Sequence, residues 1–511
     1  MLGTWAYRLV AVGHASLAIT VLELNESCKA GDTNATCVLS LGSPTYWDTQ
    51  VQLVWQGDVV LQSSTSITSQ AWMSSVSSIE FNVTGSVSLQ SDVLLKATGS
   101  VRIRADRFTA ADRVSVISAK GEVSLGSHTC SKGVYIEGLS VQLQGRSVIL
   151  HCREGEVKLA SQNGRVFADG KASREVGKTR KFPQFDHQIW IMAGTVILSD
   201  PLTTLFAQRV VIDSKKDAIV SATMARELHN GEKSGAGGED SDKGVQQVEI
   251  YTRAFGHLHL GWKGMSWFVD YIWAIGATVT LESSFTIHTE GLDGCENRET
   301  KLQDLCPALL AEWPAIGDWP KERYFFESDI KFDVMLAARD ALVMSTRSKV
   351  QGASVLACAS GKLQVMDGAS LDASGRGCEA GADADGAGHS GDRGGEPAMT
   401  YLGQARCSAA GGGGNLGDGG AGMLVRGEVS TACARRGQRR DRAFLREPLG
   451  WLPTAGAAGG GRDHCRVSSW SHNTEKCAMP PGSNGGGLVW LSAGDLRFHA
   501  GVTVKADGLA G

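Results

Sequence analysis

The chain has 511 residues, 20% of them charged, and a formal net charge of −4 that nearly balances acidic and basic side chains. This balance argues against a dedicated nucleic-acid surface, because such surfaces concentrate Lys and Arg. We therefore expect no nucleic-acid partner. Glycine contributes 64 residues, well above its ordinary share of about 7%, and these glycines are clustered rather than evenly spread.

Residues 1–24 are interpreted as a signal peptide. Arg8 precedes an apolar run from Leu9 to Leu22, which is the order of charged and apolar regions in secretory signals. A buried first strand is the alternative, because no clear small-residue cleavage site follows. The run is too short to cross a membrane, and charged residues interrupt the aromatic stretch 262–275. We expect no membrane span within this chain.

Two further patterns agree with secretion. Three asparagines begin Asn-x-Ser/Thr acceptor sequences for N-linked glycans: Asn25, Asn34 and Asn82. The cysteines form couples that are close in sequence, which in a secreted protein indicates disulfides. The candidate pairs are Cys28 with Cys37, Cys130 with Cys152, Cys295 with Cys306, Cys407 with Cys433, and Cys465 with Cys477. We therefore predict an extracellular or cell-surface location.

Residues 25–229 are predicted to form an N-terminal β-solenoid region. From about Val51 to Ala168 the sequence is a series of short strands with alternating apolar and polar residues, and helical periodicity is almost absent. A glycine opens several of these strands, at Gly85, Gly99, Gly121 and Gly155. Arg102 and Arg104 alternate in one strand and predict a solvated cationic face. Residues 230–246 are polar and glycine-rich, which indicates a linker or loop.

Residues 247–375 are predicted as a second β-solenoid region and residues 488–511 as a further coil. Three stretches, starting at Ala277, Gly361 and Gly494, share a pattern of two alternating strands separated by a small residue at Ser284, Gly368 and Gly501. The inward positions align as Val279 and Leu281, Leu363 and Val365, and Leu496 and Phe498. One such repeat cannot bury its apolar side alone, so the copies must stack into a solenoid.

The last cysteine couple, Cys358 and Cys378, leaves two alternatives open. When the alignment of the repeats is extended upstream, Cys358 falls opposite Leu491. A core position of this kind favours a buried thiol, because free cysteine behaves as a small apolar residue. A local disulfide with Cys378 is the other alternative.

Two insertions follow the first and second copies. They comprise residues 295–327 and the Gly- and Cys-rich residues 376–487. Because both leave the same corner of a coil, we expect them on the same side of the solenoid, where binding loops usually lie. Within the second insertion, residues 434–453 begin with an abruptly basic segment, which is either a solvated loop or not native sequence. The last copy stops where an earlier one continues into a loop, so we expect the chain to be part of a longer protein.

No linear catalytic motif is present, such as the zinc-protease, P-loop or nucleophile-elbow signatures. Side chains from adjacent coils could still assemble a polysaccharide-cleaving site that no linear motif reveals. His257 and His259 would share one face of a strand, but we interpret them as exposed histidines rather than zinc ligands because no third ligand is evident. We predict no catalytic residue, no cofactor and no metal.

The succession GKLQVMDGASLDASGRG, then Cys-containing glycine-rich loops, then SNGGGLVWLSAGDLRFHAGVTVKADGLAG resembles the glycine-rich β-helix repeats of very large, mostly uncharacterised surface or secreted proteins of protists. The resemblance covers about residues 276–511. It implies an all-β fold, a right-handed, pectin-lyase-like parallel β-helix with long Gly- and Cys-rich loop insertions, and carries no catalytic residues to transfer.

These observations predict a non-catalytic extracellular or cell-surface structural or adhesion module, because the chain combines a long stapled solenoid with no catalytic signature. Its expected partners are glycans or other surface proteins. The alternative is a carbohydrate-active β-helix enzyme, either a polysaccharide lyase or a hydrolase.

Overall fold

The computed structural model describes residues 21–23, 36–40, 45–47, 50–69, 77–168, 188–225, 249–289, 333–374, 400–401, 404–405, 422–426, 429–434 and 488–506. All regular secondary structure in these residues is β. The chain divides into two compact units, of which unit 1 comprises Met1–Trp267 and Ala274–Ala277, and unit 2 comprises Phe268–Trp273 and Thr278–Gly511.

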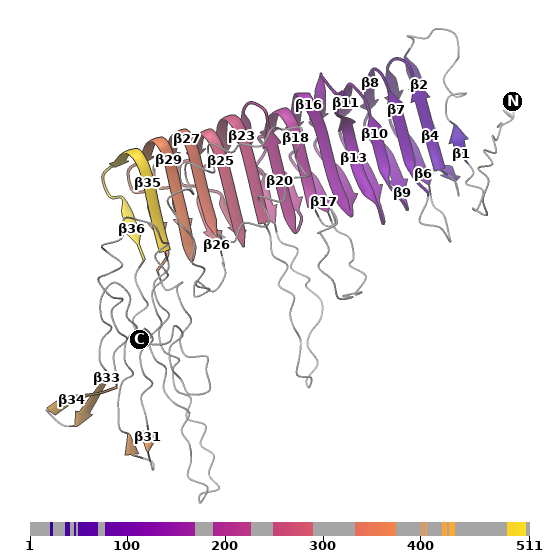
Figure 1. Ribbon diagram of the computed structural model, residues 1–511. Helices are drawn as coiled ribbons and strands as arrows, with labels where there is room; N and C mark the ends of the chain where they lie inside the picture. Colours follow the sequence, from indigo (N-terminus) through magenta and orange to yellow (C-terminus); the bar gives the residue numbers. More distant parts are fainter. Residues whose placement is uncertain are drawn as a thin grey trace, which may run out of the picture. The chain divides into compact units, whose positions relative to one another are not determined.

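Unit 1 is a parallel β-solenoid whose coils pass through three arrays of strands (Figure 1). The first array contains β1 (Val21–Glu23), β4 (Gln50–Trp55), β7 (Ile79–Val83), β10 (Val101–Arg104), β13 (Glu122–Ser127), β16 (Ser147–Leu159), β18 (Gln188–Leu198), β20 (Arg209–Ser214) and β23 (Glu249–Leu260). The second contains β2 (Cys37–Leu39), β5 (Val59–Leu61), β8 (Ser86–Leu89), β11 (Arg107–Ala110), β14 (Gly133–Ile136), the later halves of β16, β18 and β23, and β21 (Ala218–Val220).

The third array of unit 1 is a sheet of its own. It contains β3 (Thr45–Trp47), β6 (Ser66–Ser69), β9 (Leu94–Ala97), β12 (Val114–Ser118), β15 (Val141–Gly145), β17 (Arg165–Ala168), β19 (Thr204–Phe206) and β22 (Thr223–Ala225), in this order. Neighbouring strands in all three arrays are parallel, because each coil repeats the path of the one before it.

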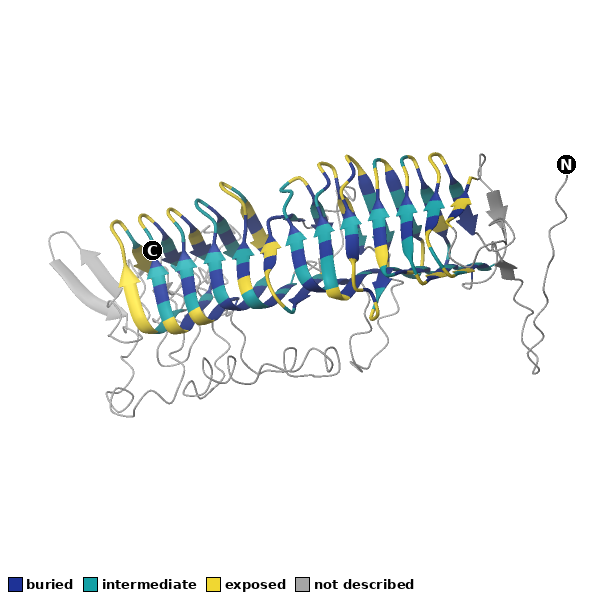
Figure 2. Ribbon diagram, turned by 90° about the horizontal axis from the view of Figure 1, so that it is seen from above, coloured by how far each residue is buried: buried dark blue, intermediate teal, exposed yellow. Residues whose placement is uncertain are grey.

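The core of unit 1 follows from the alternation of its strands (Figure 2). In β7 the side chains of Ile79, Phe81 and Val83 are buried, while Asn82 between them is exposed. Because the coils are in register, apolar residues at equal positions stack into continuous ladders. One ladder of the first array consists of Val51, Ile79, Val101, Val123, Val148, Ile189, Val210 and Ile250, all fully buried.

Glycines stand where consecutive coils approach too closely for a side chain. A Cβ atom on Gly85 would lie 2.4 Å from the carbonyl oxygen of Gly57, and one on Gly121 would lie 2.6 Å from the hydroxyl oxygen of Ser100. Real Cβ atoms do not come this close to backbone atoms, so a side chain would force the coils apart. Gly85 and Gly121, which open two of the predicted strands, are therefore explained by coil-to-coil packing.

Unit 2 repeats the same architecture. In one sheet β27 (Val334–Met344), β29 (Ser354–Val365) and β35 (Leu488–Phe498) are parallel neighbours. In another, β26 (Thr286–Thr289), β28 (Lys349–Gln351), β30 (Ser370–Asp372) and β36 (Thr503–Lys505) are parallel neighbours. β24 (Ser266–Val269) and β25 (Tyr271–Leu281) contain residues of both units. Two antiparallel pairs follow, β31 (Thr400–Tyr401) with β32 (Gln404–Ala405) and β33 (Gly422–Arg426) with β34 (Val429–Ala434).

The register confirms the alignment of the second and third copies, because Leu363 pairs with Leu496 and Val365 pairs with Phe498. Between the first and second copies lies a coil that the sequence analysis did not identify as a copy, in which Leu342 pairs with Leu363. Its corner residue is Arg347, which has a φ of 59°.

The corner positions of the other copies, Ser284, Gly368 and Gly501, also have φ values of 57°, 68° and 69°. Glycine populates this left-handed region readily, but other residues seldom do. The arginine at the corner of the intervening coil therefore hid the repeat from a search for small residues.

The interval 24–36 joins β1 to β2, but the long connections after residue 69 all enter at one corner of the coil. In unit 1, the intervals 70–76, 169–187 and 226–248 each join a third-array strand to the first-array strand of the next coil. In unit 2, the intervals after β26 and β30 lie at the equivalent position, because each follows a strand of the β26–β28–β30 sheet and precedes the long strand of the next coil, β27 or β35. The topology therefore agrees with the predicted shared corner, while residues 230–246 and 295–327 themselves lie outside the described residues.

Candidate functional site

A polar cleft with a volume of about 310 Å³ lies on the outer surface of unit 1, where the first-array strands begin. Its lining residues are Gln50, Ser78, Glu80, Gly99, Ser100, Arg102, Lys120 and Gly121. Four consecutive coils contribute to it, because Gln50 lies on β4, Glu80 on β7 and Arg102 on β10, and Lys120 and Gly121 directly precede β13. Gly99 and Gly121 contribute only backbone atoms to the lining.

An ion-pair ladder crosses this cleft from coil to coil. Arg102 Nε donates to Glu122 Oε1 at 2.7 Å, and Arg102 Nη1 donates to Glu80 Oε1 at 3.4 Å. The hydrogen bond to Glu122 and the charges of both glutamates raise the pKa of Arg102. The side chain of Arg102 is 40% exposed, so the ladder is solvated, as predicted for this arginine. The carboxylates of Glu80 and Glu122 both pair with its guanidinium.

Lys120 adds a second cation at the edge of the cleft. Its side chain is exposed and has no ion-pair partner within the described residues. Together with the hydroxyl groups of Ser78 and Ser100 and the amide of Gln50, the ammonium group offers hydrogen bonds to a polar or anionic group. The cleft is therefore a candidate for ligand contact on this face.

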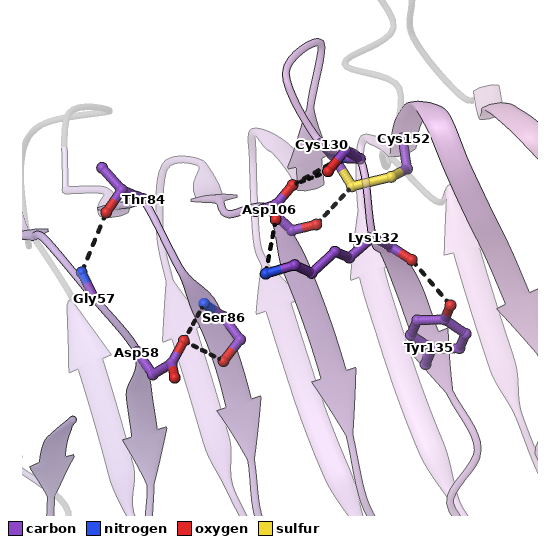
Figure 3. A network of polar contacts seen from close by, with 10 residues as sticks. Gly57, Asp58, Thr84, Ser86, Asp106, Cys130, Lys132, Tyr135 and Cys152 are labelled. Atoms are coloured by element: carbon purple, nitrogen blue, oxygen red, sulfur yellow. Dashed lines mark hydrogen bonds and ion pairs between the residues drawn. A yellow bond between two sulfur atoms is a disulfide. The ribbon is translucent and has the colours of Figure 1, made fainter. Parts of the chain in front are cut away.

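Aspartates at the first corner join consecutive coils of unit 1 (Figure 3). Asp58 Oδ1 accepts hydrogen bonds from the N–H and hydroxyl of Ser86, both at 2.7 Å. Asp106 Oδ1 accepts from the N–H and hydroxyl of Ser131 at 2.8 and 2.7 Å, and Asp106 also pairs with Lys132 at 3.2 Å. The bonds from Ser86 lower the pKa of Asp58. These carboxylates fasten one coil to the next.

A disulfide joins Cys130 to Cys152 at the same corner. It crosses from one coil to the next, since Ser127 of β13 is the register partner of Cys152 in β16. Both cysteines are fully buried. Cys37 is also disulfide-bonded, and Cys28, its predicted partner, lies outside the described residues.

Cys358 decides between the two alternatives that the sequence left open. The cysteine is fully buried, as expected for a core position, but it is disulfide-bonded and is not a free thiol. Its register partner is Ser492, and Leu491 pairs instead with Ala357. The alignment failed here because a register shift lies between Ala359 and Lys362, and an irregularity of this kind moves every residue beyond it by one position.

The remaining candidates stand as predictions. Asn25, Asn34, Cys295, Cys306, Cys378, Cys407, Cys465 and Cys477 lie outside the described residues, and so do residues 435–487 of the second insertion. Cys433 belongs to β34, whose backbone alone is described. His257 and His259 lie on the same side of β23, and the His257 backbone N–H donates to Asp217 Oδ1 at 2.7 Å. The described part of the chain contains no group of three or more potential metal ligands.

Sequence reasoning missed a buried ion pair on the outer side of the first array. Arg253 Nε and Nη2 donate to Asp213 Oδ1 and Oδ2, both at 2.8 Å, and the two side chains are only 3% and 2% exposed. They are register partners on β23 and β20. Trp190 and Val211, which also point outward, are buried as well. Alternation predicts exposure at these positions, so no sequence signal indicated their burial.

Acid is expected to destabilise unit 1 through His151 of β16. Burial, with the neighbouring charges of His128 and Arg153, lowers the pKa of His151 from 6.5 to about 4. The unfolded chain therefore takes up a proton that the folded chain does not, so this contribution to stability is complete above pH 6.5 and is lost as the pH falls toward 4. Some solvent access screens the effect, and we expect a loss of about 1–2 kcal/mol.

The variant His151→Gln isolates this effect, because the other acid-titrating groups are unchanged. Urea denaturation of both proteins above pH 6.5 and near pH 4 should show a smaller pH dependence in the variant. The same pH dependence in both proteins would show that His151 is not held in its neutral form by the fold.

None of the described segments forms a helix that could cross a membrane. No protein-family model, curated protein or solved structure matches this chain.

Proposed function

We propose that this chain is a non-catalytic structural or adhesion module located outside the cell or on its surface. The observation that carries the proposal is that the charged side chains on its outer surfaces pair with one another. On the outer surfaces of unit 1, acidic and basic residues of consecutive coils pair with each other, as in Glu80 with Arg102, Asp92 with Arg113, and Glu137 with Lys158. A catalytic site instead needs carboxylates and cations that converge on one cleft with shifted pKa values.

The coil-to-coil ties also suit a scaffold. In a solenoid each coil contacts only its neighbours, so its rigidity depends on the strength of each interface between coils. Unit 1 reinforces these interfaces with the aspartate–serine bonds of the first corner and with a buried disulfide. Such a stack suits the display of its long connections along one corner.

The proposed location has separate support. The Cys130–Cys152 disulfide, together with the disulfide-bonded Cys37 and Cys358, favours an oxidising compartment. The resemblance of residues 276–511 to the glycine-rich repeats of protist surface proteins points in the same direction. Glycans or other surface proteins are the proposed partners, bound weakly or at many sites.

The second candidate function is a carbohydrate-active enzyme, either a lyase or a hydrolase. The cleft that contains Glu80, Arg102 and Lys120 favours it, because these residues provide one carboxylate and two cations on adjacent coils. We rank it lower because both carboxylates of the ladder are engaged by Arg102.

Incubation of the purified chain with pectins, alginates and neutral glycans distinguishes the two functions. We expect no new reducing ends and no unsaturated products, together with weak binding in a glycan array or by calorimetry. Turnover that is abolished by Glu80→Gln or Lys120→Ala, but not by the control Lys158→Ala on another array, would establish the enzyme instead.

A further inference from the structure

We propose that Asn82 carries an N-linked glycan on the outer face of the first array. This inference rests on the proposed extracellular or cell-surface location. Asn82 begins the acceptor sequence Asn82-Val83-Thr84 and lies on β7, between β4 and β10. Of the three acceptor asparagines, it is the one that the structure describes.

The side chain of Asn82 is available for modification. Phe81 and Val83 on either side are 1% and 4% exposed and point into the core, so the side chain of Asn82 points outward and is exposed. Its amide has no hydrogen-bond partner within the described residues. A glycan on Nδ2 would therefore replace no contact of the fold.

The neighbours of Asn82 suit a sugar. Its register partners are Val54 on β4 and Arg104 on β10. Val54 is 48% exposed. Arg104 is exposed and has no ion-pair partner in the described part of the chain. With strands about 4.8 Å apart, the first sugar could cover Val54 and accept hydrogen bonds from Arg104.

The modification forms a bond between Nδ2 of Asn82 and C1 of the first sugar. The donor is an oligosaccharide linked to a lipid pyrophosphate, and its C1–O bond to the pyrophosphate breaks. The proton lost from Nδ2 leaves with the lipid pyrophosphate. The hydroxyl of Thr84, which completes the acceptor sequence, accepts a hydrogen bond from the Gly57 N–H at 3.1 Å in the folded chain (Figure 3).

A glycan at this position would restrict the polar cleft. Glu80 lies on the same side of β7 as Asn82, two residues and thus about 7 Å away. A glycan would stand at the margin of the cleft and would obstruct a polymer that runs along the first array across β4, β7 and β10. The outer face would then present its own glycan rather than bind a polysaccharide substrate.

Secretion of the full chain from eukaryotic cells, behind a heterologous secretion leader, tests the site independently of the native amino terminus. Mass spectrometry of the peptide that contains Asn82, after enzymatic release of N-glycans in ¹⁸O-water, should show conversion of Asn82 to labelled Asp. The variant Asn82→Gln should lose one glycan. The matched control Thr84→Ser, which keeps both the acceptor sequence and the hydroxyl, should retain it.

An unmodified Asn82 in secreted, folded protein would overturn the inference, and so would a Thr84→Ser variant that keeps no more glycan than Thr84→Ala. Failure of the proposed location gives a different result. If the chain with its own amino terminus stays inside the cell while the leader-directed chain is modified at Asn82, the site stands and the location is wrong.

Discussion

Replacing Asp213 with Asn should lower the free energy of unfolding of unit 1 by about 3–5 kcal/mol, because it leaves the buried guanidinium of Arg253 without its carboxylate. Chemical denaturation measures the global loss. Hydrogen exchange of peptides from β20 and β23 should show that the loss is centred on these strands, since solenoid coils depend mainly on their neighbours.

An exposed pair with the same geometry provides the matched control. Asp92 accepts two hydrogen bonds from Arg113 on the next coil, and these side chains are 42% and 60% exposed. Solvent screens such a pair, so Asp92→Asn should change the denaturation midpoint little. Asparagine also tolerates the positive φ of Asp92, which is 62°.

A double variant examines the origin of the loss at Asp213. Replacing both buried partners with apolar residues, as Asp213→Leu with Arg253→Met, should recover much of the stability because no unpaired charge remains. Equal stability of Asp213→Asn and the original protein would contradict the assignment of a buried pair that the fold depends on.

Removal of the disulfide by Cys130→Ala with Cys152→Ala is expected to cost about 3 kcal/mol. The two cysteines are 22 residues apart, and a crosslink over a loop of this length restricts the unfolded chain by about that amount. Guanidinium denaturation under oxidising conditions measures the difference between the original protein and the double variant.

The same comparison under full reduction separates the crosslink from packing. Both cysteines are buried, so their replacement by alanine also removes some contacts. Under reduction only this packing difference remains, so the difference in unfolding free energy between the two proteins should be much smaller than under oxidising conditions. A gap of the same size under both conditions would show that the disulfide itself contributes nothing.

The strands and their inward faces could be predicted from the sequence because they depend on local alternation. Ile79 and Phe81 of β7 are buried, and Leu363 stacks on Leu496, as the pattern requires. A residue between two apolar neighbours in a strand must point away from them, whatever the rest of the fold does. The proximity of Cys130 to Cys152 was predictable for the same reason, since their spacing corresponds to one coil.

The candidate site was predictable only in part. Arg102 stood out in the sequence as one of two alternating cations, but its partners Glu80 and Glu122 are 22 and 20 residues away. Which residues face each other across coils depends on the length of each corner, and these lengths vary along unit 1. The cleft and the ladder therefore became visible only once the register between coils was known.

The sequence by itself determined the fold class, the inward residues and the corner at which long connections enter, because each of these follows from a repeated local pattern. Only the tertiary structure revealed the additional coil that contains Arg347, the register shift near Cys358, and the burial of Asp213 with Arg253. These depend on backbone conformation and on packing against distant residues. Periodicity describes which side of a strand a residue occupies, but what lies against that side is decided by the assembled coils.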